Sequence, residues 1–381
     1  MMQHPRCGSF VLFLLCCFSP AMGDESSQSA TAEAAPSQWI TSIASLSDDG
    51  TFVAATANGL LMQPASVDRL TSDQPQARTQ LYTHPAAVWC VVSFSEGTKI
   101  ASVDYRGNLA IYDLAEANLT MHEKALERWC QSLIVAPSGD LLVAGNEAGK
   151  ILVWNVADSK VAKSVELDGH AITGLAISPD QKQLAASDGS GQIHFLQWPN
   201  LEPVGKSKIS DSPAWCVAYA PEGDQVLVGS GDNHLYQLGN QADAEAKVLA
   251  TGQDWITNLS ISESGEIAAG EVGGNLHMIS NGMTATPVIK TFTSSSGVWS
   301  LCWNGTQELL VGSRKDGISR MGRSWDWIAE PKKSESETVP DEASNEEASE
   351  AASKEKETAQ TSESTETPEK PESNQADPNS K

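Results

Sequence analysis

The sequence predicts an all-β protein, a seven-bladed β-propeller whose blades are four-stranded antiparallel sheets. One unit recurs seven times: an apolar strand, a polar turn with glycine, a second apolar strand, a short glycine turn and a third strand. The spacing from one first strand to the next is roughly 40 to 50 residues, which is typical of four-stranded blades. No long segment has apolar residues at the helical spacing of about 3.6 residues. Seven blades of about 40–45 residues need roughly 280 to 315 residues, which this chain of 381 residues can hold.

Residues 1–23 have the pattern of an export signal. A weakly basic start precedes the apolar run Val11–Phe18, and the small residues of Ala21-Met22-Gly23 mark a cleavage site. The run is too short to span a bilayer as a helix. We therefore expect cleavage, a Ser/Ala/Gln linker over 24–37, and an exported protein (periplasmic, cell-envelope or extracellular) without stable membrane insertion. An uncleaved anchor or a misplaced start residue is the alternative.

The seven copies occupy one uninterrupted region, so we expect a single propeller domain over residues 38–329. They run over residues 39–62, 88–113, 129–155, 169–198, 214–238, 255–279 and 298–321. Leu141–Ala144 is a continuous apolar run, as in a strand buried on both faces, and Val217-Ala218-Tyr219 fits a buried strand as well. Ser324–Ile328 alternates like a further strand after the last copy.

The copies resemble the WD-repeat family. The fourth copy carries Gly169-His170 and Ser178-Pro179-Asp180 and ends its third strand at Trp198. The third copy has Val153-Trp154-Asn155, and the second ends in Tyr112-Asp113, where the family has Trp-Asp. The resemblance covers about residues 38–328. It implies the propeller fold and a scaffold that binds peptides through side chains at the starts of the inner strands.

The chain also departs from the family pattern. The Gly-His pair is complete only once, and the turn Asp that would bridge to such a His is present only as Asp232 and Asp316. The buried His–Asp–Ser–Trp network of the family is therefore expected to be mostly absent. The family usually closes its ring with an N-terminal strand, but only the linker precedes Trp39 here. We expect Ser324–Ile328 to form the outer strand of the seventh blade instead.

Composition excludes some partners. The formal net charge is −24, which repels phosphate backbones and makes nucleic acid an unsuitable partner. Residues 330–381 are rich in Glu, Ser, Thr and Pro with almost no large apolar residue, so we expect a disordered acidic tail, either an inert solubilising segment or a spacer. Four cysteines lie beyond the signal, all in apolar strand patterns, and we expect buried free thiols rather than disulfides. They are Cys90, Cys130, Cys216 and Cys302.

No local motif for catalysis is present. The sequence has no nucleophile elbow, no phosphate-binding loop ahead of a helix, and no histidine pair at metal-ligand spacing with a carboxylate. We therefore predict a protein that is not an enzyme, with no catalytic residue, metal or cofactor. One alternative stays open, because a metal-dependent propeller hydrolase can collect single ligands from different blades in its channel.

Tryptophan is the candidate binding feature. Six of the eleven Trp residues lie at the start of a blade's first strand, in two registers that are two residues apart. Residues two apart on a strand face the same side, so one rim of the channel should carry an indole in six blades of seven. The candidate ligand-binding residues are Trp39, Trp89, Trp129, Trp215, Trp255 and Trp299. Indoles wedged between blades as core are the competing interpretation; on a platform, Trp129 and Trp255 should be the more exposed.

These features predict a monomeric, extracytoplasmic scaffold that binds a protein or peptide through its Trp-rich face. A lectin-like binder of glycans or envelope polymers would use the same indoles, since Trp presents a large apolar ring with one polar atom. The sequence does not decide between these two, and the channel-metal hydrolase is the third hypothesis.

Overall fold

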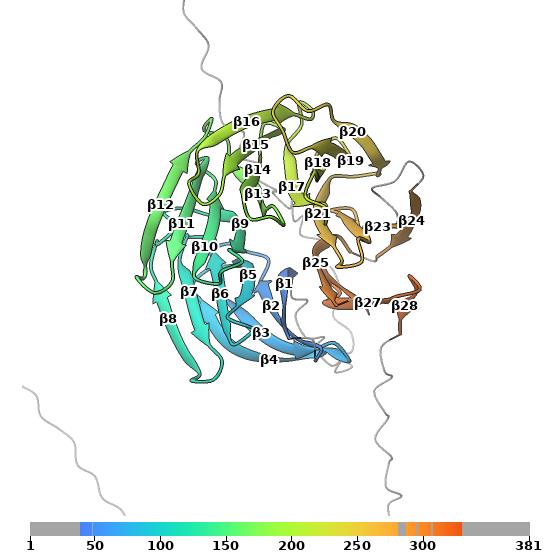
Figure 1. Cartoon of the computed structure of the whole chain (residues 1–381). Helices are drawn as coiled ribbons and strands as arrows, with labels where there is room; N and C mark the ends of the chain where they lie inside the picture. The colour runs from blue at the N-terminus through green and yellow to red at the C-terminus, as the bar shows by residue number, and fades with distance from the viewer. Residues whose placement is uncertain (1–38, 48, 281–286, 295, 306–307, 330–381) are drawn as a thin grey trace, which may run out of the picture. The chain divides into compact units, whose positions relative to one another are not determined.

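A computed structural model describes residues 39–47, 49–280, 287–294, 296–305 and 308–329. Seven four-stranded antiparallel sheets form a ring around a common centre, so the predicted seven-bladed all-β propeller is confirmed (Figure 1). All described residues belong to one compact unit. The predicted export signal, the linker and the acidic tail lie outside the described residues.

The twenty-eight strands follow chain order, four to a blade. Blades 1 and 2 contain β1 (Trp39–Ser47), β2 (Thr51–Ala57), β3 (Ala65–Thr71), β4 (Gln74–His84), β5 (Val88–Phe94), β6 (Lys99–Asp104), β7 (Leu109–Asp113) and β8 (Asn118–His122). Blades 3 and 4 contain β9 (Cys130–Val135), β10 (Leu141–Asn146), β11 (Lys150–Asn155), β12 (Lys160–Glu166), β13 (Ile172–Ile177), β14 (Gln183–Asp188), β15 (Gln192–Gln197) and β16 (Pro203–Lys208).

The remaining three blades continue the same order. Blades 5 and 6 contain β17 (Ala214–Tyr219), β18 (Gln225–Ser230), β19 (His234–Gly239), β20 (Lys247–Thr251), β21 (Ile256–Ile261), β22 (Ile267–Glu271), β23 (Asn275–Ser280) and β24 (Val288–Thr293). Blade 7 contains β25 (Val298–Asn304), β26 (Glu308–Ser313), β27 (Ile318–Gly322) and β28 (Trp327–Ile328). Each blade is thus one continuous stretch of chain, with its first strand innermost and its fourth outermost (Figure 1).

The outer strand of blade 7 comes from the segment after β27, as predicted. It is only two residues long: Trp327 pairs with Met321, and Ile328 pairs with Arg320. The β3–β4 hairpin of blade 1 supplements this short edge, because the Gln76 side chain donates to the main-chain oxygen of Ile318 at 2.9 Å. At this outer edge, blades 1 and 7 are therefore joined by side-chain contacts and a side-chain hydrogen bond.

Adjacent blades fit together through one repeated contact. The residue that opens each inner strand is completely buried in every blade: Ile40, Val88, Cys130, Ile172, Ala214, Ile256 and Val298. Each large opening residue meets a small residue near the end of the preceding blade's second strand. A Cβ added at Gly145 would lie 2.4 Å from Ile172, and one at Gly270 would lie 2.3 Å from Val298. Close packing between blades therefore depends on paired large and small side chains.

Blade 7 meets blade 1 through the same contact, and we call this interface the closing seam. Gly312 of β26 takes the side chain of Ile40, which belongs to one buried cluster with Ile43, Phe52, Ala54, Leu70, Leu310 and Ile318. The amide of Ile43 donates to the Ser300 hydroxyl at 2.8 Å across this interface. The closing seam is thus packed like the others.

The expected loss of the buried His–acid network was wrong in part. His84 lies 3.3 Å from the Asp104 carboxylate and 2.8 Å from the Ser102 hydroxyl, and His194 contacts Asp188 at 2.8 Å. Blade 6 has the same pairing with Glu271, whose carboxylate lies 2.5 Å from His277.

The sequence interpretation looked for the acid at the family's turn position and found it only as Asp232 and Asp316, but Asp104, Asp188 and Glu271 are the last residues of the second strands. There, Asp104 also accepts from the amides of Arg106 and Asn108 in the following turn. In blade 4, burial alone would raise the pKa of Asp188, but hydrogen bonds from His194, Ser190 and Gln192 outweigh it and hold that pKa at about 2. Each acid thus fixes both a histidine and a turn.

Candidate functional site

The six candidate tryptophans alternate in register from blade to blade. In blades 1, 3 and 6 the indole residue directly precedes the buried opening residue, and in blades 2, 5 and 7 it directly follows it, at a bulge in the strand pairing. Blade 4 has Ala171 and Thr173 at these positions. Where Trp follows the opening residue, a compact residue precedes it: Ala87, Pro213 or Gly297. The alternation gives each indole room beside its neighbours.

Four of these indoles, from four consecutive blades, form one continuous cluster, which we call the indole arc. Its members in ring order are Trp299, Trp39, Trp89 and Trp129. The Trp39 ring centroid lies 4.5 Å from that of Trp299 and 5.6 Å from that of Trp89, and Trp89 lies 4.9 Å from Trp129, all edge to face. This geometry is the favoured one for aromatic pairs. Tyr105 extends the arc, with its ring 5.0 Å from Trp129.

The other two indoles form a separate pair on blades 5 and 6. The rings of Trp215 and Trp255 are stacked, with centroids 5.6 Å apart and an interplanar angle of 26°. Blade 4, which has no indole at these positions, separates the pair from the Trp129 end of the arc. The predicted ring is therefore two aromatic groups.

Exposure differs among the six. Trp39 is 9% exposed, Trp255 is 39% exposed, and the others are half-buried. Greater exposure was expected at both Trp129 and Trp255, and it is found only at Trp255. Trp39 shares their register but is the most buried, because it lies between Trp89 and Trp299 and under the guanidinium of Arg314, 5.4 Å from its ring centroid.

The polar atoms of these indoles are unusual. The indole N–H groups of Trp39, Trp129, Trp215 and Trp299 are buried and have no hydrogen-bond partner among the described residues. An indole N–H can only donate, and a buried donor without an acceptor is costly. The candidate site therefore combines aromatic surface with N–H donors that are buried within it.

Apolar and basic side chains lie next to the arc. In the turn between β2 and β3, Leu60 is 63% and Met62 is 54% exposed, while Leu61 between them packs on the arc. Arg106, in the turn after β6, donates to the main-chain oxygen of Met62 at 3.5 Å. This part of the rim thus offers apolar and cationic groups to solvent.

Comparison with known proteins identifies the repeat. The family described as "WD domain, G-beta repeat" matches residues 162–195. These residues include most of β12 and all of β13 and β14, together with most of β15, so the matched unit joins the outer strand of blade 3 to blade 4. This chain is a diverged WD-repeat β-propeller.

Several curated proteins are similar in sequence to part of this WD-repeat chain. Protein groucho of Drosophila melanogaster is 27% identical over 38% of the chain and 21% of its own length. Guanine nucleotide-binding protein subunit beta-like protein 1 of Mus musculus is 28% identical over 34% of the chain and 40% of its own length. The 77 kDa echinoderm microtubule-associated protein of Lytechinus variegatus is 20% identical over 61% of the chain and 37% of its own length. The alignments thus span two fifths or less of these relatives.

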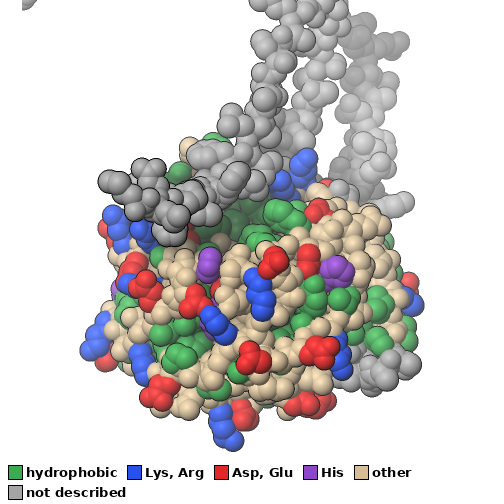
Figure 2. Space-filling model, turned by 90° about the horizontal axis from the view of Figure 1, so that it is seen from above, with side chains coloured by type: hydrophobic (Ala, Val, Ile, Leu, Met, Phe, Trp, Pro, Cys, Tyr) green, Lys and Arg blue, Asp and Glu red, His purple; other side chains and the backbone are tan. Residues whose placement is uncertain are grey.

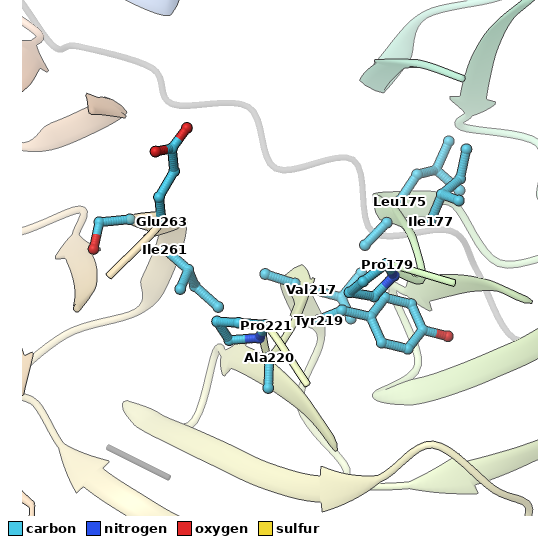
Figure 3. A pocket seen from close by; sticks show the side chains of 12 residues that line it. Leu175, Ile177, Pro179, Val217, Tyr219, Ala220, Pro221, Ile261 and Glu263 are labelled. Atoms are coloured by element: carbon cyan, nitrogen blue, oxygen red, sulfur yellow. The ribbon is translucent and has the colours of Figure 1, made fainter. Parts of the chain in front are cut away.

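The opposite ends of the inner strands form a second feature, which sequence reasoning missed. A hollow of about 480 Å³ lies between the ends of β13, β17 and β21 (Figure 3). Its walls include Ile177, Pro179, Tyr219, Pro221 and Ile261, so it is largely apolar. The signal in the sequence was the two prolines Pro179 and Pro221, which follow two of the inner strands. The sequence interpretation assigned both to ordinary turns.

Metal-ligating side chains do not cluster in the described part of the WD-repeat ring. No group of three or more His, Cys, Asp or Glu side chains there could hold a metal ion. The four cysteines are free, with Cys130 buried and the rest half-buried, and burial raises the pKa of Cys90, Cys216 and Cys302 to about 12. No helix among the described residues is long and apolar enough to cross a membrane.

Proposed function

We propose that this WD-repeat propeller is a non-catalytic scaffold that binds a protein or peptide at the rim carrying the indole arc. The observation that carries the proposal is the arc itself. Half-buried indoles with unused N–H donors lie beside the exposed side chains of Leu60 and Met62. Trp is among the residue types most enriched at binding hot spots.

Two further observations support a binding role. Relatives carry names that refer to binding, a guanine nucleotide-binding protein subunit and a microtubule-associated protein. On the face that Figure 2 shows, acidic and basic side chains are mixed and dispersed among uncharged surface. That face offers no single-sign patch to compete with the aromatic rim as a docking surface.

Binding partners isolated from the native exported fraction test the proposal, with one purified partner titrated against the wild-type chain and two variants. Trp89→Ala should weaken binding by about 2 kcal/mol, as expected for a hot spot. The matched control is Val204→Ala with Val248→Ala, since both valines are exposed on outer strands. Equal affinity of the wild-type chain and Trp89→Ala would refute the proposed site.

A glycan-binding function is the second candidate, and the stacked pair of Trp215 and Trp255 favours it. Trp255 keeps an exposed ring face, and exposed indoles can stack on sugar rings. A glycan array distinguishes the two functions: binding that is lost in Trp255→Ala but kept in Trp89→Ala supports the lectin-like role.

The location we propose is extracytoplasmic, on the strength of the apolar run Val11–Phe18 and the small residues that follow it. Mass spectrometry of the N-terminus of the protein isolated from its source tests this. A mature chain that begins at Asp24 supports export, and a chain that retains residues 1–23 in the cytoplasm contradicts it.

A further inference from the structure

We propose that the partner of the indole arc is an extended polypeptide segment that carries a carboxylate beside an apolar side chain. This inference rests on the proposed function and adds the chemistry of the ligand. It follows from three properties of the rim between blades 7 and 3: the kind of hydrogen-bonding atoms, the charge, and the exposed apolar side chains.

The hydrogen-bonding atoms of the arc are donors without acceptors. The indole N–H groups of Trp39, Trp129 and Trp299 are buried and unpartnered, and Trp39 is more than nine-tenths buried. Because these N–H groups are buried, a ligand can reach them only if the rings shift, and it could then satisfy them only with acceptor oxygens. Main-chain carbonyls of an extended segment and side-chain carboxylates supply such oxygens.

Two arginines add positive charge at the same place. Arg314 stacks over Trp39, and Arg106 lies in the turn next to Tyr105, which contacts Trp129. Neither guanidinium forms an ion pair with any described carboxylate. Guanidinium groups bind carboxylates with paired hydrogen bonds, so a carboxylate is the complementary partner group.

The acidic groups around the arc are engaged elsewhere. Asp316 accepts a hydrogen bond from the Ser296 hydroxyl, and Glu147 lies 3.6 Å from Arg128. Asp104, below the turn of Arg106, is buried and bound to His84. The guanidinium groups of Arg106 and Arg314 are therefore cationic groups beside the arc that lie outside the described ion pairs, although the chain as a whole has a net charge of −24.

The apolar requirement comes from Leu60 and Met62. Both are exposed beside the arc, and Leu61 between them packs against it. An apolar side chain of the ligand would cover this surface while a neighbouring carboxylate meets the arginines. A polypeptide supplies carbonyls, carboxylate and apolar side chain within a few residues, which a glycan does not.

A phage-displayed library of random 12-residue peptides, selected on the full chain, tests the proposal. Selected peptides should carry Asp or Glu within two residues of an aromatic or aliphatic residue. One such peptide, made with a fluorescent label, should bind at least tenfold more weakly to Arg106→Ala/Arg314→Ala. The matched control is Arg69→Ala/Arg323→Ala, which removes the same charge from exposed positions of blades 1 and 7 and should bind as the wild-type chain does.

Met62 gives a pair of variants that leave packing intact, since its side chain is exposed. Met62→Glu should weaken peptide binding at least threefold more than Met62→Lys, because both variants remove the same apolar contact and only Met62→Glu adds a charge that repels the peptide carboxylate. Peptides without an acidic preference, or binding that is unchanged in Arg106→Ala/Arg314→Ala, would overturn the inference. In either case the proposed function would still stand if Trp89→Ala weakened binding of the selected peptide. If Trp89→Ala left that binding unchanged, the inference and the proposed function would both fail.

The acidic segment 331–381 is the competing occupant. Peptides recovered only on a chain that ends at residue 330 would show that this segment fills the site, and the proposed separate partner would then be wrong. Failure to select any peptide on either chain would also overturn the inference.

Discussion

Replacement of Gly312 by alanine probes the packing of the closing seam. Gly312 has no left-handed backbone conformation, so an alanine there causes no backbone strain. Its Cβ would lie 2.7 Å from Cγ2 of Ile40 and 3.2 Å from Cδ1 of Ile43. Both neighbours are buried, so neither can move away freely. Overpacking of this kind costs about 1–3 kcal/mol of unfolding free energy.

The partner substitution relieves the same overlap. Ile40→Ala alone should cost about 2–5 kcal/mol, because Ile40 is completely buried. It also removes the Cγ2 atom that an alanine at position 312 would overlap. The double variant Gly312→Ala/Ile40→Ala should therefore be more stable than the sum of the single effects predicts, by about 1 kcal/mol or more.

Urea unfolding of the two single variants, the double variant and the wild-type chain measures this coupling. Gly189→Ala is the control, since its Cβ would have no neighbour nearer than 3.8 Å and its backbone is not left-handed. It should be close to neutral. The paired large and small packing would be refuted if the double variant lost the sum of the two single-variant losses within about 0.5 kcal/mol. It would also be refuted if Gly189→Ala lost as much stability as Gly312→Ala.

Three further predictions follow from burial and charge. Trp39→Ala should cost about 3–5 kcal/mol of stability and Trp255→Ala less than about 1.5 kcal/mol, because Trp39 is buried and Trp255 is exposed; equal losses in thermal unfolding would contradict this difference in burial. Because the pKa of Asp188 lies near 2 in the folded chain against 3.8 ordinarily, this carboxylate stabilises the fold above about pH 4 and loses that effect as the pH falls toward 2. Asp188→Asn should therefore be less stable at pH 6 and should lose less stability than the wild-type chain between pH 4 and 2, as urea titrations at each pH would show. Since burial raises the pKa of Cys90, Cys216 and Cys302 to about 12, these thiols should react with a thiol reagent at pH 8 only after unfolding, and rapid labelling of the folded chain would contradict this.

The fold could be predicted because the same local sequence pattern recurs seven times. The inner strands are short and largely apolar, and many turns carry glycine at a position with a left-handed backbone, such as Gly139 or Gly223. One copy would be ambiguous, but seven at similar spacing leave few alternatives to a propeller. The short strand β28 was also predictable, because Trp327 and Ile328 follow the last copy directly.

The site was less predictable, because it depends on contacts between blades. The sequence shows which residues open the inner strands. The edge-to-face packing of Trp39 on Trp89 arises only when blades 1 and 2 dock, and its packing on Trp299 only when the ring closes. The alternating register was readable, since Ala87 and Gly297 stand where other blades have Trp. The acids of the histidine network were missed because the family's turn position was searched, two residues past the strand ends that hold Asp104 and Asp188.

The continuity of each blade has a consequence for how the ring folds. All hydrogen-bonded ladders join strands that are neighbours in the sequence, so they need only short loops to close. Among the described residues, the contact between blades 7 and 1 joins the most distant parts of the chain. We expect this contact to form after the blades, so substitutions at Gly312 or Ile40 should speed unfolding and leave the refolding rate nearly unchanged. The lifetime of the folded ring would then be set by one interface between residues from opposite ends of the domain.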